Sequence, residues 1–198
     1  MIWKNIKLNK ALKRILREKP NLEDVILFGS VVRGKEKPGD IDILVLFKDK
    51  VNKEDEYLIR KELERYFKNL AIISKTINSL YDSAFDAREA ILFEGISLIS
   101  GKKLTDKFGL SPLGMFKYSF KEWSKLTKTK FYHAFNGRNG SLGFSKEVNA
   151  IKLSDGIVLV SLDKIEAMKE FLSSWNLSYQ YFPILLPDRF NKKSILEG

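Results

Sequence analysis

Two short motifs, nine residues apart, carry the side chains of this chain best suited to chemistry. Gly29-Ser30 comes first, and Asp40-Ile41-Asp42 follows. Two carboxylates two positions apart on an extended chain lie on one face, while Ile41 between them turns into the core. Because like charges repel, this arrangement favours a divalent cation such as Mg²⁺, which can carry the phosphates of a substrate. The Gly-Ser turn offers backbone N–H groups and a hydroxyl to those phosphates, and a helix beginning there would add to the attraction.

Two apolar runs must position these motifs. Residues 25–28 and 41–47 predict buried strands, because each is a short, continuous apolar segment bounded by turn residues. The loop between them contains Gly29, Gly34, Pro38 and Gly39. The first motif therefore ends one strand, and the second motif begins the next.

With each motif attached to its own apolar strand, the pattern resembles the signature of the DNA polymerase β-like nucleotidyltransferase superfamily. The segments FGS, Arg33-Gly34 and DIDILV look most similar to the archaeal and bacterial minimal nucleotidyltransferases, over residues 10–105. The resemblance implies a Mg²⁺- or Mn²⁺-dependent transfer of a nucleotidyl group from an NTP, with ATP expected, to an acceptor hydroxyl. It implies Asp40 and Asp42 as catalytic residues and metal ligands, and Gly29, Ser30 and Arg33 as nucleotide-binding residues. For Arg33, an outward, solvated side chain is the alternative.

One part of the family pattern is missing. Active members usually supply a third carboxylate from the next strand, and the strand predicted at 70–77 contains no acid. The next acids, Asp82, Asp86, Glu89 and Glu94, fall on a helix predicted at 79–94, where we expect them to be solvated or capping groups. Asp82 or Asp86 could reach the site only if the strand is placed differently from this prediction. A single metal held by Asp40 and Asp42 is one alternative. The other is a protein that binds nucleotide and performs no transfer.

Positive charge is concentrated in two segments. The segments 4–19 and 117–138 carry charges of +6 and +5, so the rest of the chain sums to −1 in a net charge of +10, which suggests RNA or DNA as a partner. The alternative is two solvated helix faces on a lysine-rich surface. A helix predicted at 121–136 aligns four residues that could follow a phosphate backbone and stack a base: Lys121, Lys125, Lys128 and Tyr132.

The order of elements predicts an α/β (α+β) protein with two domains. The first, at 1–108, has a short mixed sheet with helices at 3–19, 53–68 and 79–94. The segment 109–114, GLSPLG, is the expected linker. The second domain, at 115–198, has strands expected at 115–120, 150–153, 157–162 and 179–186, with helices at 121–136 and 163–175. This β-α-β-β-α-β order predicts a ferredoxin-like accessory domain whose role the sequence does not give.

Composition limits the remaining possibilities. The chain has no cysteine, which excludes disulfides and thiolate metal sites, and its one histidine, His133, has no metal-binding neighbours. No segment has the pattern of a signal peptide or a membrane span, so we expect a cytoplasmic protein without membrane contact. The acceptor stays open. RNA or DNA is one hypothesis, and a HEPN-type partner ribonuclease is a second, since antitoxin members of the resembled family adenylylate such partners. A non-catalytic nucleotide or nucleic-acid binder is the third.

Overall fold

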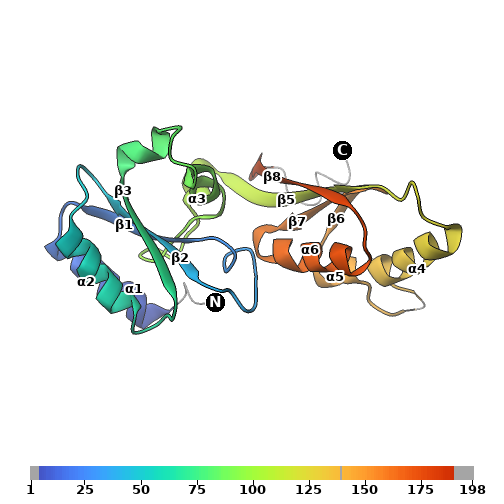
Figure 1. Ribbon diagram of the computed structural model, residues 1–198, viewed down its shortest axis with the longest axis horizontal. Coiled ribbons are helices and arrows are strands. Elements are labelled where there is room, and N and C mark those ends of the chain that lie inside the picture. Colours follow the sequence, from blue (N-terminus) through green and yellow to red (C-terminus); the bar gives the residue numbers. More distant parts are fainter. Residues whose placement is uncertain (1–4, 139, 190–198) are drawn as a thin grey trace. The chain divides into compact units, whose positions relative to one another are not determined.

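The computed structural model describes residues 5–138 and 140–189 (Figure 1). The chain divides into two compact units, of which the first ends at Phe108 and the second begins at Gly109. Of the helices in the described ranges, none combines the length and the apolar composition needed to cross a bilayer.

The first unit is built on a four-stranded mixed sheet in the order β3-β2-β1-β4. Strand β2 pairs in parallel with β3 and antiparallel with β1, which in turn pairs antiparallel with β4. Its strands are β1 (Leu22–Phe28), β2 (Ile41–Phe47), β3 (Leu70–Thr76) and β4 (Ile96–Ser97). Its helices are α1 (Ile6–Glu18), α2 (Lys53–Leu63), η2 (Ile77–Tyr81), α3 (Arg88–Glu94) and η3 (Leu104–Phe108).

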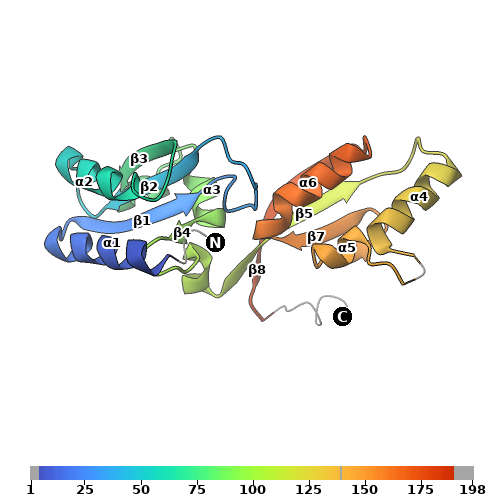
Figure 2. The ribbon, with the colours of Figure 1, turned by 90° about the horizontal axis from the view of Figure 1, so that it is seen from below.

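Both faces of this sheet are covered, which explains why β1 and β2 are continuous apolar runs. One face packs Ile26, Phe28, Leu44 and Leu46 against Ile91 of α3. Helices α1 and α2 lie together on the other face (Figures 1 and 2). Strand alternation places Asp42 on the α3 face, in line with Leu44 and Leu46.

Side-chain caps fix where α1 and α2 begin. The side chain of Asn5 accepts hydrogen bonds from the backbone N–H groups of Lys7 and Leu8. Asn52 makes the equivalent pair of bonds at the start of α2. Such caps satisfy backbone donors that the first helical turn leaves unpaired.

Two predicted helices of this unit are shorter than the sequence pattern suggests. Helix α2 ends at Leu63 and not at 68, and only the ends of the segment 79–94 are helical, as η2 and α3. Between them, the Asp82 carboxylate accepts a hydrogen bond from the backbone N–H of Ala84 at 2.9 Å. This local bond competes with helical pairing, and Phe85 turns into the core instead.

The second unit has the β-α-β-β-α-β order expected of a ferredoxin-like fold. Its antiparallel sheet has the order β6-β7-β5-β8, which puts the first and third strands at the centre. Its strands are β5 (Leu110–Tyr118), β6 (Ile151–Ser154), β7 (Ile157–Ser161) and β8 (Tyr179–Pro187). Its helices are α4 (Lys125–Asn136), α5 (Phe144–Glu147), η4 (Leu162–Lys164) and α6 (Ile165–Ser174), as Figure 2 shows.

The prediction of a linker at 109–114 is wrong, because β5 begins at Leu110 and this segment is part of the strand. Pro112 pairs with Leu185 of β8 but lies before the first pair between β5 and β7, so this part of β5 has one neighbouring strand. Proline is tolerated at such an edge position. At Gly114 a Cβ atom would lie 2.8 Å from Ile165 Cγ1, so glycine here permits close packing of α6 and not a flexible connection.

Candidate functional site

The Gly29-Ser30 turn lies directly against the second carboxylate of the acidic motif. Phe28, the last residue of β1, pairs with Asp42 near the start of β2. Gly29 has a φ of +82°, a conformation that side chains disfavour, and a Cβ atom at this position would overlap Asp42 Oδ2. Both the backbone conformation and the lack of space for a Cβ atom therefore favour glycine at this position. Because glycine has no side chain, the backbone can approach the carboxylate closely.

The chain after Gly29 forms tight turns, not a helix. The Gly29 carbonyl accepts hydrogen bonds from the backbone N–H groups of Val32 and Arg33 at 3.1 and 3.4 Å. The residues from Ser30 to Gly34 form turns. No helix begins here, so a helix dipole does not contribute to the attraction of phosphates. Ser30 is half-buried at the edge of this turn.

Asp40 and Asp42 form an acidic pair with unequal surroundings. Asp40 is exposed just before β2, and Asp42, the second residue of the strand, is half-buried. Partial burial raises the pKa of the Asp42 carboxyl, and the negative charges of Asp40 and Glu94 raise it further, while Arg33 opposes them. The ionised form of Asp42 therefore lacks sufficient compensating positive charge from the protein.

Glu94, at the end of α3, is a site residue that the sequence reasoning assigned wrongly. It is not a solvated group, because only 2% of it is exposed. Its Oε1 accepts a hydrogen bond from the backbone N–H of Gly29 at 2.9 Å, and both its oxygens lie 2.8 Å from Arg33 Nη1. The carboxylate thus fixes the Gly29 turn and Arg33 together.

This ion pair changes the expectation for Arg33. The side chain of Arg33 is one-quarter exposed and forms an ion pair with Glu94. It is therefore not an outward, solvated side chain, and it is not free to contact phosphate alone. Glu94 is buried, and its oxygens are already engaged by Arg33 and by the N–H of Gly29, so we do not assign it the place of the missing third carboxylate. The one sequence signal for it is an acid that closes the apolar run of residues 90–93 directly before Gly95.

The structure identifies where a third carboxylate would stand. Strand β3 runs parallel to β2 with Asp42 opposite Ala71, so the β3 residues on the face of Asp42 are Ala71, Ile73 and Lys75. None of them is acidic, and the Lys75 ammonium lies 5.0 Å from the centre of the Phe85 ring. Asp82 caps a local turn, whereas Asp86 and Glu89 are exposed.

The donor set fits one divalent cation that also binds a substrate. Among residues 5–138 and 140–189, no group of three or more His, Cys, Asp or Glu side chains is placed to hold a metal ion. Mg²⁺ is commonly bound by one or two carboxylates, with waters and substrate phosphates completing its octahedron. Asp40 and Asp42 supply that minimum, and a cation would offset both the burial and the repulsion that raise the pKa of Asp42.

The predicted stripe on the second unit is only partly present. Helix α4 begins at Lys125, so Lys121 precedes it, while Lys125, Lys128 and Tyr132 remain on a common helical side. The Tyr132 ring is half-buried, and its centre lies 5.4 Å from the Phe120 ring and 5.5 Å from the Lys152 ammonium. In this position Tyr132 already has packing partners.

Comparison with known proteins identifies one family and a set of distant structures. Residues 10–103 match the family model described as "Polymerase beta, Nucleotidyltransferase". No curated protein matches the chain. A mutant MntA-HpeT toxin–antitoxin is 19% identical with a TM-score of 0.35, and the match covers 50% of this chain and 78% of that one.

Two further solved structures are similarly distant. A tri-AMPylated Shewanella oneidensis HEPN toxin in complex with MNT antitoxin gives 21% identity and a TM-score of 0.33, over 52% of this chain and 76% of that one. A toxin–antitoxin structure with AMP-PNP gives 21% identity and a TM-score of 0.35, over 50% and 78%. Likenesses at this level carry no argument about activity.

Proposed function

Residues 10–103 belong to the polymerase β-type nucleotidyltransferase family, and from this premise we propose that the chain transfers a nucleotidyl group from an NTP to an acceptor hydroxyl. The first unit is the transferase domain in this proposal, and the second is an accessory domain. Pyrophosphate is the leaving group, and ATP is the expected nucleotide.

The observation that carries this proposal is the approach of the Gly29 backbone to Asp42. A phosphate-binding turn and a metal-binding carboxylate are useful to each other only if both can reach the same triphosphate. Gly29 has a positive φ, and the space beside it is so narrow that a Cβ atom would overlap Asp42 Oδ2. The turn and the carboxylate are therefore in direct contact. The family membership supports the same assignment.

Each residue of the site has a proposed task. Asp40 and Asp42 would hold Mg²⁺ or Mn²⁺, and such an ion supplies Lewis-acid stabilisation of charge on the transferred phosphate and the leaving oxygen. The backbone N–H and the hydroxyl of Ser30 would bind the terminal phosphates, because the N–H of Gly29 is already donated to Glu94 and Gly29 contributes the shape of the turn. Arg33 places positive charge beside the turn, and Glu94 positions Arg33 and Gly29.

The site contains no evident general base. Ala71, Ile73 and Lys75 occupy the β3 positions from which an acid could activate the acceptor hydroxyl. The proposal therefore predicts slow transfer unless the acceptor itself carries an activated hydroxyl or a partner supplies the base. RNA is the acceptor that the positive charge favours, and a hydroxyl of a partner protein is the other outcome that the test distinguishes.

Transfer of label from α-³²P-labelled nucleotides tests the proposal. ATP, CTP, GTP and UTP are supplied in turn with Mg²⁺ or Mn²⁺, together with purified RNA or with lysate protein as acceptor. We expect transfer from at least one nucleotide, reduced at least 100-fold in Asp40→Ala/Asp42→Ala protein. Asp49→Ala/Asp106→Ala removes the same charge elsewhere in the unit and serves as the control.

The outcomes separate the alternatives. Label in RNA identifies a nucleic-acid acceptor, and label in a protein identifies the protein acceptor. Nucleotide binding without transfer to either acceptor would refute the enzymatic proposal and leave a nucleotide-binding protein.

A further inference from the structure

The outer face of α1 carries five cations that have no acidic partner. Lys7, Lys10, Lys13, Arg14 and Arg17 are all exposed, and none forms an ion pair within the described part of the chain. We call these five residues the basic face. At 100° per residue they all point away from Leu8 and Leu12, which are fully buried against the sheet. Lys4 of the predicted basic segment lies outside the described residues.

This concentration of charge opposes the formation of the helix that carries it. Residues three or four positions apart on a helix are neighbours, so Lys10 faces Lys7, Lys13 and Arg14, and Arg17 faces Lys13 and Arg14. The first turn of α1 contains no acid that could interact favourably with the helix dipole. Of the five, Arg17 lies in the last turn and suits the helix dipole, so folding alone does not account for the other four.

Helix α2 shows how the same unit arranges charges that serve folding. Its first turn contains Glu54, Asp55 and Glu56, and its last turn contains Arg60 and Lys61, in agreement with the helix dipole. Lys53 pairs with Glu56 at 2.7 Å and Lys61 with Glu64 at 3.0 Å. The basic face has no acid in its first turn and no ion pair among the described residues, and only Arg17, in the last turn, agrees with the dipole, although α1 and α2 pack side by side.

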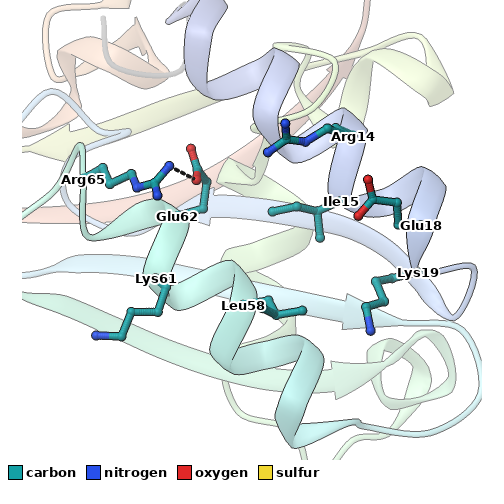
Figure 3. A pocket seen from close by; sticks show the side chains of 8 residues that line it. All are labelled: Arg14, Ile15, Glu18, Lys19, Leu58, Lys61, Glu62 and Arg65. Atoms are coloured by element: carbon teal, nitrogen blue, oxygen red, sulfur yellow. Dashed lines mark hydrogen bonds and ion pairs between the residues drawn. The ribbon is translucent and has the colours of Figure 1, made fainter.

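A groove lies between the two helices, beside Arg14. It has a volume of about 340 Å³, and Figure 3 shows Arg14 and Glu18 from α1 on one side and Lys61 and Arg65 from the α2 side on the other. Four of its lining residues are cationic and two are acidic. Lys19 pairs with Asp55, Lys61 with Glu64 and Arg65 with Glu62. Arg14 is therefore the cation of the groove that has no ion pair among the described residues, and it belongs to the basic face.

From these observations we infer that the basic face of α1 binds the phosphodiester backbone of a nucleic acid. Lys7, Lys10, Arg14 and Arg17 form a line along the helix at intervals of three or four residues, which gives neighbouring Cβ atoms a spacing of about 5–6 Å. A regular line of exposed cations suits a linear polyanion. Exposed aromatic side chains are absent from the described residues of α1, so we expect contacts to phosphates and little base preference.

Fluorescence anisotropy with the full chain tests this surface. The probe is a fluorescein-labelled single-stranded RNA of 20 nucleotides and mixed sequence, titrated at several KCl concentrations between 50 and 200 mM. Lys10→Glu/Arg14→Glu/Arg17→Glu is compared with Lys48→Glu/Lys50→Glu/Lys68→Glu, which changes the net charge equally at exposed positions elsewhere in the unit. Circular dichroism confirms that both variants fold.

We expect the α1 variant to lose at least tenfold in affinity at 100 mM KCl and the control less than threefold. The slope of log affinity against log salt should become less negative by about 2 in a matching Ala variant, because each lost single-strand contact contributes about 0.7. Equal losses in the two Glu variants would overturn the proposal. So would competition by polyglutamate as effective, per charge, as competition by unlabelled RNA.

The basic face and the proposed transferase site can fail separately. Asp40→Ala/Asp42→Ala protein should bind the RNA as the unmodified chain does, and the α1 variant should bind Mg²⁺ and ATP as before. Loss of RNA binding in the aspartate variant would place the nucleic acid at the site and refute the assignment to α1.

Discussion

The first unit has two clusters of uncompensated charge, one negative and one positive. The acidic pair, Asp40 and Asp42, lies at the start of β2, and the basic face lies on the outside of α1. At both places the protein gathers charges that repel one another and supplies too little compensation. Helix α2 and the pair of Arg33 with Glu94 show that the same unit neutralises charges elsewhere. In our proposals, the two surfaces with uncompensated charge bind an external ion, and the surfaces with paired charges support the fold.

The largest expected effect comes from removing the ion pair between Arg33 and Glu94, which neutralises charge beside the acidic pair. In Glu94→Gln, Arg33 loses its counter-charge and becomes available to the acidic pair, while an amide oxygen can still accept the bond from Gly29. We expect the free energy of unfolding to fall by about 2 kcal/mol, as for a lost hydrogen-bonded charge partner that is largely buried. Mg²⁺ should also bind more weakly.

Denaturant unfolding and calorimetric titration with Mg²⁺ in the presence of a non-hydrolysable ATP analogue measure both effects. Glu89→Gln is the control, because Glu89 is exposed on the same helix. Unchanged stability in Glu94→Gln would show that the ion pair does not hold the turn.

A second prediction sharpens the comparison by adding charge to the acidic pair. Ala71→Asp places a third carboxylate beside Asp42, on the strand position where the sheet register brings the two side chains to one face. We expect affinity for Mg²⁺ or Mn²⁺ to rise about tenfold, which corresponds to about 1.4 kcal/mol. Ala71→Asn matches the size without the charge and should not raise the affinity. An equal gain in both variants would mean that charge at this position is not the cause.

The third prediction uses acidity to remove charge from the same pair. Burial and the charges of Asp40 and Glu94 raise the pKa of Asp42, and only its deprotonated form binds a cation. Affinity for Mn²⁺ without nucleotide should therefore fall as the pH drops through this raised pKa, by up to about tenfold for each unit below it. Calorimetric titrations at decreasing pH follow this loss.

The mutation Asp40→Asn removes one of the causes of the shift. The pKa of Asp42 should fall, and the loss of Mn²⁺ affinity should begin at a lower pH than in the unmodified chain, although the affinity itself is weaker. A midpoint that stays in place would show that Asp40 does not influence the titration of Asp42.

The smallest effect tests the repulsion within the basic face. Lys7→Glu/Lys10→Glu replaces repulsive neighbours with attractive ones and adds acids near the start of α1. We expect the free energy of unfolding to rise by about 0.5–1 kcal/mol, measured as an increase in Tm of a few degrees. Lys61→Glu breaks the pair with Glu64 and puts an acid in the last turn of α2, where the helix dipole disfavours it, and should lower the Tm. A change of the same sign in both variants would contradict the contrast between the helices.

Local signals in the sequence are sufficient for one half of the site. Gly29-Ser30 and Asp40-Ile41-Asp42 are adjacent to their strands along the chain, so strand alternation and turn chemistry already indicate their positions. The β-α-β-β-α-β order of the second unit is confirmed, because the polar turn Ser154-Asp155-Gly156 marks its hairpin and helical periodicity separates the other strands.

The other half depends on contacts between distant residues. Glu94 reaches Gly29 across 65 positions, and no periodicity reports that an acid at the end of α3 will be buried. The expected linker failed for a related reason, since glycine and proline in GLSPLG can mean flexibility or close packing. Only the pairing of β5 with β8 and the approach of Ile165 to Gly114 decide between these meanings.

The geometry at Gly29 bears on how this site could change over evolutionary time. A side chain at this position is opposed by the positive φ as well as by the overlap with Asp42, and the first obstacle would persist if Asp42 were replaced. A descendant that no longer bound metal could therefore vary at Asp40 and Asp42 while still keeping its glycine. In such a lineage, survival of the glycine would record the shape of the turn, whereas survival of both aspartates would record selection for the chemistry.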